Sequence, residues 1–365
     1  MNPDRRSLRS GAMPPVRHAG HAAGRAVRRP TINDVAALSG VSKSTVSNVM
    51  RGTGSVSAAT HARVLESIKA LGYRPNAAAR NLVQQRTNLI GVVVGDLANA
   101  FNAELVKRLE QHACTHGYTT LVCNTGGHAE REAARIEALL EQRVDGIALL
   151  EFTGDRAVLS QLLAERVPVI MISCWADYAD CVAVDDYAGI ALAIDHLVGL
   201  GHSRIGHAID GLMEPTTRRT RMDAFERALL RRGLEVRPEW SITWDDAVEP
   251  TSGERAVQTL FHSDHAPSAM VAANDFTAIR LMELAEASGL GVPEQLSVVG
   301  FDGIAIGELS RIALTTVAQP REELASLSLE VLLSRMEQGP NAPSRQHRLQ
   351  PSLIVRGSTG PPPSG

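Results

Sequence analysis

Residues 31–52 read TINDVAALSGVSKSTVSNVMRG, and this stretch contains the signals of two short helices. Thr31 followed three residues later by Asp34 is the spacing of a capping box, in which two side chains bond free backbone N–H groups at a helix start. Gly40 interrupts the first helix, because glycine readily takes the positive φ of a tight turn. Ser42 has the residue type of a helix N-cap. The stretch therefore predicts a helix, a tight turn and a second helix.

The second helix is expected to have an apolar inner face and a small polar outer face. The inner residues are Val46, Val49 and Met50. The outer residues are Lys43, Ser44, Thr45, Ser47 and Asn48. In a helix-turn-helix unit such an outer face enters the major groove, where lysine and asparagine bond base edges and hydroxyls bond bases or phosphates. The alternative is an ordinary pair of helices with a solvated polar face.

The next segment extends this pattern. Ser57 is expected to cap a third helix that ends at Gly72, and the chain continues with YRPN at 73–76 and AAARNLVQQRT at 77–87. Together, the DVA, SGVS, TVS and YRPN motifs and the short leucine-containing segment resemble the head and hinge of the LacI/GalR family of bacterial transcription regulators. The resemblance covers residues 31–87 and implies binding to double-stranded DNA.

The resemblance also implies roles for single residues. Lys43, Ser44 and Asn48 would read bases in the major groove, and Leu82 would be a wedge in the minor groove. A hinge helix of about seven residues is too short to be stable alone in water, so it is expected to fold when two copies pack together in the groove. The alternative for Leu82 is packing against its own core domain. The expected DNA contacts are Thr31, Ser42, Lys43, Ser44, Thr45, Ser47, Asn48, Tyr73, Asn76, Ala79 and Leu82.

One position departs from the family pattern. The family usually has arginine where this chain has Asn48. Arginine favours guanine in the major groove, whereas asparagine favours adenine. The sequence therefore predicts a changed base preference at the position that residue 48 reads.

Charge is distributed unevenly along the chain. Residues 1–86 contain 14 lysines and arginines and 3 acidic residues, a net charge of +11. Residues 87–365 contain 23 basic and 37 acidic residues, a net charge of −14. A basic head on an acidic body suits a head that binds phosphate. Residues 1–29 are rich in arginine and lack apolar periodicity, which predicts a disordered tail.

Several function classes are disfavoured. No apolar run reaches the roughly 18 residues of a membrane span, and the N-terminus lacks the apolar segment of a signal peptide. Four cysteines without a CxxC pair suit a reducing cytoplasm. Two histidine pairs, His112 with His116 and His262 with His265, lack a partner cluster, so neither a metal nor a cofactor is expected. The chain shows no P-loop, no G-x-S-x-G motif and no G-x-G-x-x-G spacing, so no enzyme activity is expected.

From residue 87 onward, short apolar strands alternate with helical segments. Strands are expected near 89–95, 119–124, 146–150, 167–172, 204–209, 269–272 and 296–301. This alternation predicts parallel sheets with helices on both faces. The motifs VDDYAG, HLVGLGHSRIGH, ANDFTA and SVVGFDG resemble the two-lobed, periplasmic-binding-protein-like core of the same regulators. The resemblance implies one lobe at 87–186 plus 318–345 and the other at 187–317 plus 346–356.

In doubly wound folds, ligands bind at the carboxyl ends of strands, in the crevice between lobes. By resemblance, Arg221, Asn274 and Asp302 contact a small-molecule effector. Trp244 is either a stacking platform for the effector or a core residue. The expected effector contacts are Asn99, Phe101, Asp186, Arg221, Trp244, Asn274 and Asp302.

A second departure bears on the ligand class. The family often has Asn-Pro-Phe-Phe after the first strand, where this chain has Asn99-Ala100-Phe101-Asn102. Loss of the second aromatic residue removes one stacking face for a flat base. A sugar or sugar acid is therefore expected in preference to a purine.

The predicted fold is α/β, with an N-terminal all-α helix-turn-helix head and a hinge helix before a two-lobed core of doubly wound parallel sheets. The expected parts are a disordered basic tail at 1–29, the DNA-binding domain at 30–74, the hinge at 75–86, an effector-binding and dimerisation core at 87–356 and a flexible tail at 357–365. The predicted function is that of a cytoplasmic, homodimeric repressor that binds a near-palindromic operator under effector control. The alternatives are a sugar-binding receptor of the periplasmic-binding-protein type without a regulatory role, and an enzyme on a Rossmann-like scaffold.

Overall fold

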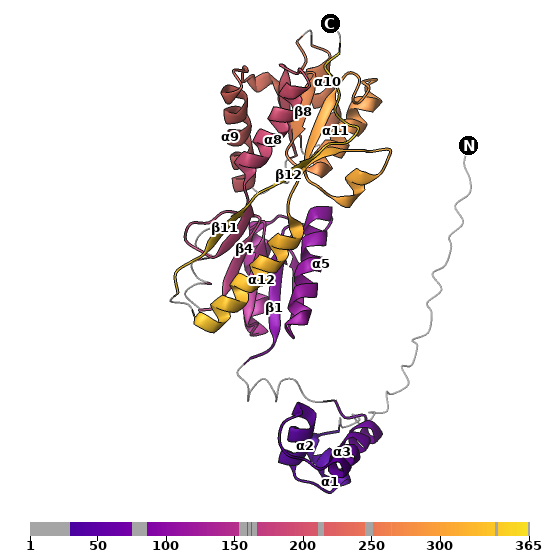
Figure 1. Cartoon of the computed structure of the whole chain (residues 1–365), viewed down its shortest axis with the longest axis vertical. Coiled ribbons are helices and arrows are strands. Elements are labelled where there is room, and N and C mark those ends of the chain that lie inside the picture. Colours follow the sequence, from indigo (N-terminus) through magenta and orange to yellow (C-terminus); the bar gives the residue numbers. More distant parts are fainter. Residues whose placement is uncertain are drawn as a thin grey trace, which may run out of the picture. The chain divides into compact units, whose positions relative to one another are not determined.

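The computed structural model describes residues 30–74, 86–152, 159, 162, 166–210, 215–244, 251–263, 265–339 and 342–363. The chain forms two compact units, Met1–Gln85 and Arg86–Gly365 (Figure 1). The expected tail at 1–29 lies outside the described residues, and so does the expected hinge except for Arg86.

The first unit contains three short helices. They are α1 (Ile32–Ser39), α2 (Lys43–Arg51) and α3 (Ala58–Leu71). Each begins at the cap that the sequence predicts. The backbone N–H of Thr31 donates to Asp34 Oδ2 at 2.7 Å, which is half of the capping box. Ser42 and Ser57 each accept a backbone N–H three residues on, and Gly40 takes the left-handed conformation that the turn requires.

The three helices enclose a small apolar core. Val35, Val46 and Val64 are fully buried, and one side of each helix contributes to the cluster. Tyr73, which follows α3, is 9% exposed and packs in the same cluster. The helix-turn-helix prediction is therefore confirmed as a packed unit, with the polar side of α2 left outside.

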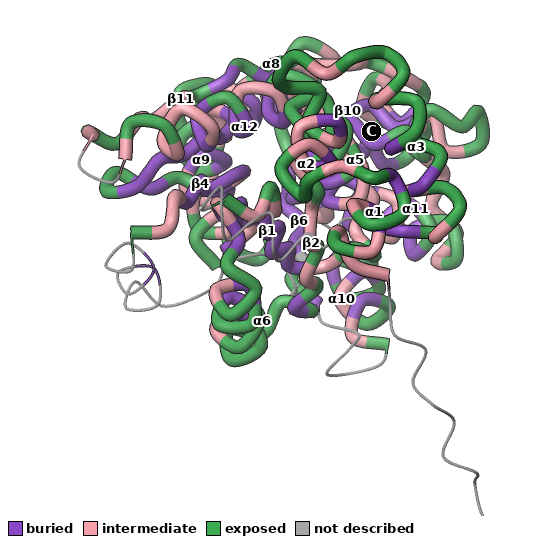
Figure 2. The backbone as a smooth tube through the Cα atoms, turned by 90° about the horizontal axis from the view of Figure 1, so that it is seen from below, coloured by how far each residue is buried: buried purple, intermediate pink, exposed green. Residues whose placement is uncertain are grey.

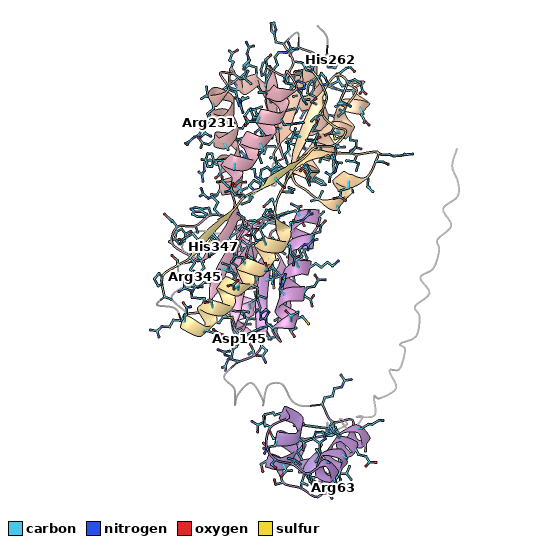
Figure 3. All side chains as sticks on the ribbon, in the orientation of Figure 1. Arg63, Asp145, Arg231, His262, Arg345 and His347 are labelled. Atoms are coloured by element: carbon cyan, nitrogen blue, oxygen red, sulfur yellow. The ribbon has the colours of Figure 1, made fainter. Side chains whose placement is uncertain are left out.

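The first lobe of the second unit is a six-stranded sheet with the order β11-β5-β4-β3-β1-β2. The strands are β1 (Leu89–Val94), β2 (Thr119–Asn124), β3 (Gly146–Leu150), β4 (Val169–Ile172), β5 (Cys181–Val184) and β11 (Gln346–Leu349). All neighbouring pairs are parallel. Thr87 N and Asn88 N donate to the Asp145 carboxylate at 2.9 and 2.7 Å, which fastens the start of this lobe (Figure 3).

Helices cover both faces of this sheet. α5 (Ala100–Thr115) packs beside α12 (Arg321–Gln338) over the face that carries Ile90 and Val92. α6 (Ala129–Glu141) covers the face that carries Val93. Figure 2 shows β4 buried inside the lobe and α6 with an exposed outer side. Successive residues of β1 thus pack against helices on opposite faces of the sheet. This explains why the strand is a continuous apolar run in the sequence.

The second lobe has a six-stranded sheet with the order β12-β10-β9-β8-β6-β7. The strands are β6 (Ile205–Asp210), β7 (Ser241–Trp244), β8 (Ala269–Ala272), β9 (Ser297–Asp302), β10 (Thr315–Ala318) and β12 (Ser352–Ile354), of which β12 alone is antiparallel to its neighbour. The helices are α8 (Asp186–Gly199), α9 (Pro215–Arg231), α10 (Ser252–Phe261) and α11 (Asp275–Ala287), with short 3-10 turns η1 (Pro238–Trp240) and η2 (Ala305–Glu308). The doubly wound fold class is confirmed.

The chain crosses between the lobes at three described places. They are the steps from β5 to α8, from β10 to α12 and from β11 to β12. The lobe boundary expected at 345/346 is wrong, because residues 346–349 form β11 and pair with β5 in the first sheet. Only the strand after it, β12, belongs to the second lobe. The expected helix near 155–165 lies largely outside the described residues.

The last residues do not match the expected flexible tail over 357–360. The N–H groups of Gly357 and Ser358 both donate to Ala313 O, and Ser358 is 1% exposed. The Gly360 carbonyl lies 2.9 Å from His202 Nε2. The tail is thus packed against the second lobe. Among the described residues, no helix is both long enough and apolar enough to cross a bilayer.

Candidate effector cleft and DNA-binding surface

The outer face of α2 carries the predicted base-reading residues. Lys43 and Ser44 are exposed. Ser42 Oγ caps α2 and lies 2.7 Å from Ser44 Oγ and 2.9 Å from Thr45 Oγ1, so these three hydroxyls form one local network. The predicted contacts at Asn76, Ala79 and Leu82 lie outside the described residues.

Three other predicted DNA contacts have structural roles in the head. Thr31 belongs to the capping box of α1, and Tyr73 is a core residue whose ring is almost fully buried. The backbone carbonyl of Ser47 accepts from Arg51 Nε at 3.3 Å, a bond that does not involve the Ser47 hydroxyl. Lys43, Ser44 and Asn48 remain the predicted base readers on the outer face of α2.

In the second lobe, Arg221 is the centre of a buried polar cluster. It lies on α9 and is 5% exposed. Its Nε donates to Asp186 Oδ1 at 2.9 Å, and its Nη1 donates to Ala273 O and lies 3.9 Å from Asp302 Oδ1. The guanidinium also lies 3.8 Å above the ring of Phe301. The guanidinium therefore joins the start of α8 to the carboxyl ends of β8 and β9.

Asp302 ends β9 in an unusual conformation. Its φ is +121°, a region that favours glycine, and such strain is frequent at ligand sites. Its Oδ1 accepts Gln319 Nε2 at 2.7 Å. Burial raises the pKa of the Asp302 carboxyl well above its usual value, Arg221 opposes this shift, and the nearby Asp275 and Glu151 carboxylates add to it. The same balance of burial against Arg221 raises the pKa of Asp186.

Asp275 is a further buried carboxylate beside Asp302. It is fully buried, accepts Thr316 Oγ1, and accepts the backbone N–H of Ile304 at 2.8 Å. Burial raises the pKa of Asp275 to about 6, although these hydrogen bonds lower it. The role of Asp275 is thus structural, since its oxygens hold β10 and the loop after β9 together.

From the first lobe, Asn102 and Glu151 reach the same region. Asn102 lies on α5, is 1% exposed, and donates from Nδ2 to Glu151 Oε2 at 2.6 Å and to Asp96 O at 3.1 Å. Glu151 follows β3, and its carboxylate raises the pKa of Asp302 in the other lobe. The carboxylates of the two lobes therefore face the same space.

Two buried amide oxygens in this region have no hydrogen-bond donor in the described structure. Asn102 Oδ1 and Gln319 Oε1 are both buried and unpaired, while the NH₂ group of each side chain donates to a carboxylate. An unpaired buried acceptor costs about 1–3 kcal/mol, so each site favours a donor supplied by a ligand or by water. A ligand with N–H or O–H groups could thus donate hydrogen bonds to both amide oxygens.

The other predicted effector residues have structural roles within the two lobes. Asn99 caps α5 by accepting the Phe101 N–H at 3.0 Å, and Phe101 is a core residue of the first lobe. Asn274 caps α11 by accepting the Thr277 N–H at 2.7 Å. Trp244 is 5% exposed and packs in the apolar core of the second lobe, so the stacking-platform interpretation of this residue is wrong.

A second tryptophan lines the interlobe region instead. Trp175 follows β4, is 41% exposed, and lies under the Arg348 guanidinium at 4.2 Å. Both residues line an open hollow together with Asp186, Tyr187 and threonines of α9. The position of Trp175 three residues after the end of a strand was the available sequence signal. Arg348 lies on β11, which the sequence interpretation assigned to the wrong lobe.

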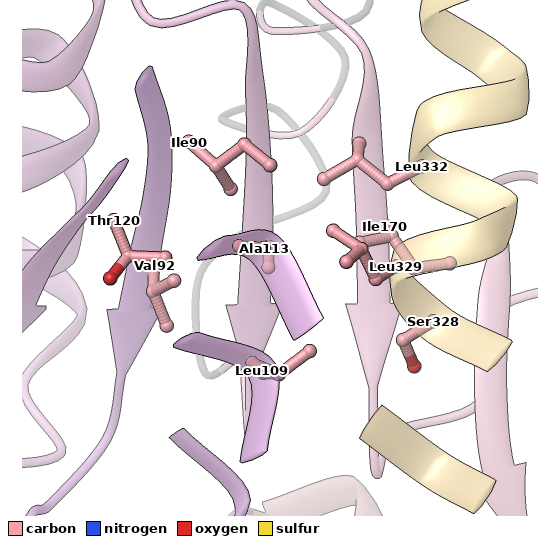
Figure 4. Close-up of a pocket in the computed structure, with 10 residues that line it drawn as sticks. Ile90, Val92, Leu109, Ala113, Thr120, Ile170, Ser328, Leu329 and Leu332 are labelled. Carbon is pink, nitrogen blue, oxygen red and sulfur yellow. The ribbon is translucent and has the colours of Figure 1, made fainter. Parts of the chain in front are cut away.

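A hollow inside the first lobe is of a different kind. It lies between β1, β3, β4, α5 and α12, and its lining is apolar apart from the hydroxyls of Thr120 and Ser328 (Figure 4). The space that a water-sized sphere can occupy in it is only about 10 Å³. It lacks charged side chains, so it is a packing gap of the core and not a candidate effector site.

Comparison with known proteins gives matches over both units. Residues 31–76 match the model of bacterial regulatory proteins of the lacI family, and residues 194–359 match a periplasmic binding protein-like domain. The chain is 33% identical over 334 residues to the HTH-type transcriptional repressor PurR of Haemophilus influenzae (strain PittEE), covering 90% of this chain and 98% of that protein. It is 34% identical over 334 residues to the ribose operon repressor of Escherichia coli (strain K12), covering 90% and 99%.

Solved structures agree with these relatives. The lac repressor dimer bound to operator and the anti-inducer ONPF is similar with a TM-score of 0.81 and 28% identity, covering 91% of this chain and 100% of that one. A LacI family transcriptional regulator from Enterococcus faecium with bound ribose gives a TM-score of 0.64 at 28% identity, covering 75% and 99%.

Proposed function

The chain belongs to the lacI family of bacterial regulatory proteins, and we propose that it is a homodimeric repressor whose operator affinity is set by a small molecule in the interlobe cleft. The observation that carries the proposal is the joint presence of a helix-turn-helix head and a buried polar cluster around Arg221. Its curated relatives are named repressors, and a similar dimer has been solved on its operator.

The head supplies the DNA contacts of this proposal. Two copies of α2 would enter the major grooves of two half-sites, so the operator would be near-palindromic. Leu82 of each copy would open a base step at its centre. The basic charge of residues 1–86 supplies the phosphate attraction that such binding requires. This charge and the head argue against a sugar receptor without a regulatory role. The place of action would be the cytoplasm, where bacterial DNA lies.

The cleft supports a sugar as the effector. Two carboxyl groups, those of Asp186 and Asp302, lie beside the guanidinium of Arg221. The guanidinium is already paired with Asp186. A sugar acid would bring a further negative charge among these carboxylates, whereas sugar hydroxyls would donate to Glu151 and to the unpaired oxygens of Asn102 and Gln319. Of the two expected ligand classes, the geometry therefore favours an uncharged sugar.

An aromatic surface completes the proposed cleft. The exposed face of Trp175 offers the apolar surface that Trp244 does not, because Trp244 lies in the core. Ligand pockets combine such apolar surfaces with a few placed polar groups. A regulator of similar fold has been solved with bound ribose, and another in complex with cellobiose.

Effector and operator binding would be linked through the lobes. A ligand that contacts Glu151 in one lobe and Asp302 in the other changes the relative stability of lobe arrangements. The start of the first lobe is fastened at Asp145, so a lobe movement would be passed to the hinge that precedes Thr87. The coupling must then be reciprocal between effector and operator.

The proposal is tested by thermal unfolding of the full chain in the presence of sugars, sugar acids, sugar phosphates and nucleobases. A ligand at 100 times its Kd stabilises the folded protein by about 2.7 kcal/mol. We expect stabilisation by an uncharged sugar, and its loss in Asn102→Leu but not in the exposed control Asp195→Asn. Stabilisation by acids or nucleobases alone would overturn the ligand class. An absence of response to every probe would contradict sugar control.

A further inference from the structure

We propose that Arg51 is a base-reading residue of the head and that Asn48 positions it, so that the pair selects guanine where Asn48 alone would select adenine. This inference rests on the proposed function, because it concerns the sequence of the operator. It changes the expectation drawn from the replacement of the family's arginine by Asn48.

The position of Arg51 on α2 is the first observation. Val46 and Val49 form the buried side of this helix. An α-helix advances about 100° per residue, so Ser44 and Arg51, seven residues apart, lie in line on the opposite side. Arg51 is exposed and is the last residue of α2. It therefore shares the outer face with the predicted base readers Ser44 and Asn48.

The second observation is how the guanidinium is held. Arg51 Nε donates to Ser47 O at 3.3 Å, and Arg51 Nη2 donates to Asn48 Oδ1 at 3.3 Å. Both bonds use the edge of the guanidinium formed by Nε and Nη2. Nη1 has no acceptor in the described head, so Nη1 and the second hydrogen of Nη2 offer two parallel N–H donors. Such a pair of donors fits O6 and N7 of guanine.

The third observation is that both polar atoms of the Asn48 side chain have neighbours within the head. An asparagine reads adenine with two bonds, one accepted by its oxygen and one donated by its nitrogen. Here the oxygen already accepts from Arg51. The nitrogen lies against Gly54, where an added Cβ would come within 3.2 Å of Nδ2. Asn48 is therefore held between Gly54 and Arg51, and it is placed to orient the arginine.

A guanidinium that is already held in its binding conformation should bind guanine more tightly than a free one. A free arginine loses rotamer freedom when it binds, whereas a fixed guanidinium loses less. The helix C-terminus also favours a cation at position 51. The competing role for an exposed arginine is a phosphate contact, which would add affinity without base preference.

The test is selection of binding sites from a randomised DNA library by the full-length protein, followed by affinity measurements on the four base variants of each selected position. The proteins are the wild type, Arg51→Ala, Arg51→Lys and the control Arg63→Ala. Arg63 is an exposed arginine on α3 of the same head, so its replacement removes the same charge (Figure 3).

We expect the wild type to prefer guanine at one position of each half-site by about ten-fold or more. Arg51→Ala should lose that preference and gain one for adenine, because the Asn48 oxygen becomes free. Arg51→Lys should weaken it, since lysine keeps the charge and can still reach guanine but lacks the planar pair of donors. Arg63→Ala should keep the wild-type motif.

Three results would overturn the inference. The first is an Arg51→Ala protein that selects the wild-type motif with a uniform loss of affinity, which would make Arg51 a phosphate contact. The second is a wild-type preference for adenine at the position affected. The third is a guanine preference in Arg51→Lys that equals the wild-type preference. A wild-type protein that selects no motif at all would refute the proposed function itself, and this result is distinct from the other three.

Discussion

The Nε atom of Arg221 lies 2.9 Å from Oδ1 of Asp186, and this partly buried pair joins α9 to the first residue of α8. The same guanidinium reaches Asp302 at the end of β9. One positive charge therefore compensates two buried carboxylates that belong to different elements. The second-lobe half of the proposed effector cleft depends on this arrangement.

Replacing Arg221 by methionine should both destabilise the protein and abolish the effector response. It leaves Asp186 and Asp302 buried without their counter-charge, a change that typically costs about 3–5 kcal/mol. Without the guanidinium the pKa values of both carboxyls rise further, so the loss should be smaller at acid pH, where the carboxyls are protonated. Urea unfolding at two pH values measures both effects. Arg232→Ala, which breaks an exposed pair with Asp195, is the matched control, and an equal loss in the two variants would contradict the assignment.

His207 should make the protein sensitive to acid. Burial, together with the nearby Arg221, lowers the pKa of His207 from 6.5 to about 3. The folded protein keeps this imidazole neutral, whereas the unfolded chain takes up a proton below its ordinary pKa. The free energy of unfolding therefore falls as the pH falls from 6.5 towards 3, by about 1.4 kcal/mol per pH unit from this group.

His207→Phe should remove this slope. The His207 ring stacks on Phe225 with centroids 4.8 Å apart, and a phenyl ring preserves that contact without a titratable group. Denaturant unfolding across the acid range measures the slope in both proteins. An identical slope would show that protonation of His207 does not drive the acid sensitivity.

Ser358 should stabilise the second lobe from the C-terminal segment. Its Oγ accepts the Thr315 N–H at 2.8 Å and donates to Val298 O at 2.6 Å. Ser358→Ala removes the side-chain partner of both backbone groups in a buried place, which should cost about 1–3 kcal/mol in the free energy of unfolding. Ser326→Ala, which removes a partly exposed hydroxyl on α12, is the control. A thermal unfolding curve of Ser358→Ala that matches the control would mean that the tail does not contribute.

Leu82→Ala should weaken operator binding while leaving the unfolding of the second unit unchanged. A smaller side chain cannot keep a base step open, so the bent operator loses its wedge. A footprinting titration measures the affinity. Leu230→Ala, which alters a 66% exposed leucine on α9, is the control. Equal operator affinity of wild type and Leu82→Ala would refute the wedge assignment.

Local signals made the head predictable. The Thr31–Asp34 box, the Ser42 cap and the Gly40 turn each act over four residues or fewer, and all three are present in the structure. The apolar strands of the core were equally readable, because a strand buried on both faces is a continuous apolar run.

Long-range relationships were not predictable in the same way. β11 was assigned to the wrong lobe because its partner, β5, lies more than 160 residues earlier in the chain. Trp244 and Trp175 have the same residue type, and only the fold decides which one is buried. The pair of Asn102 and Glu151 spans 49 residues, so the sequence pattern contained no sign of it.

The measurement that tests the central claim most directly is the affinity of the full-length protein for its selected operator, with and without the sugar that stabilises it in the thermal assay. Linked sites require that the sugar change the operator Kd by the same factor by which operator changes the sugar Kd. We predict a factor of roughly 5 to 150 in both directions, lost in Arg221→Met. An operator Kd that does not change at saturating sugar would contradict effector control through the interlobe cleft.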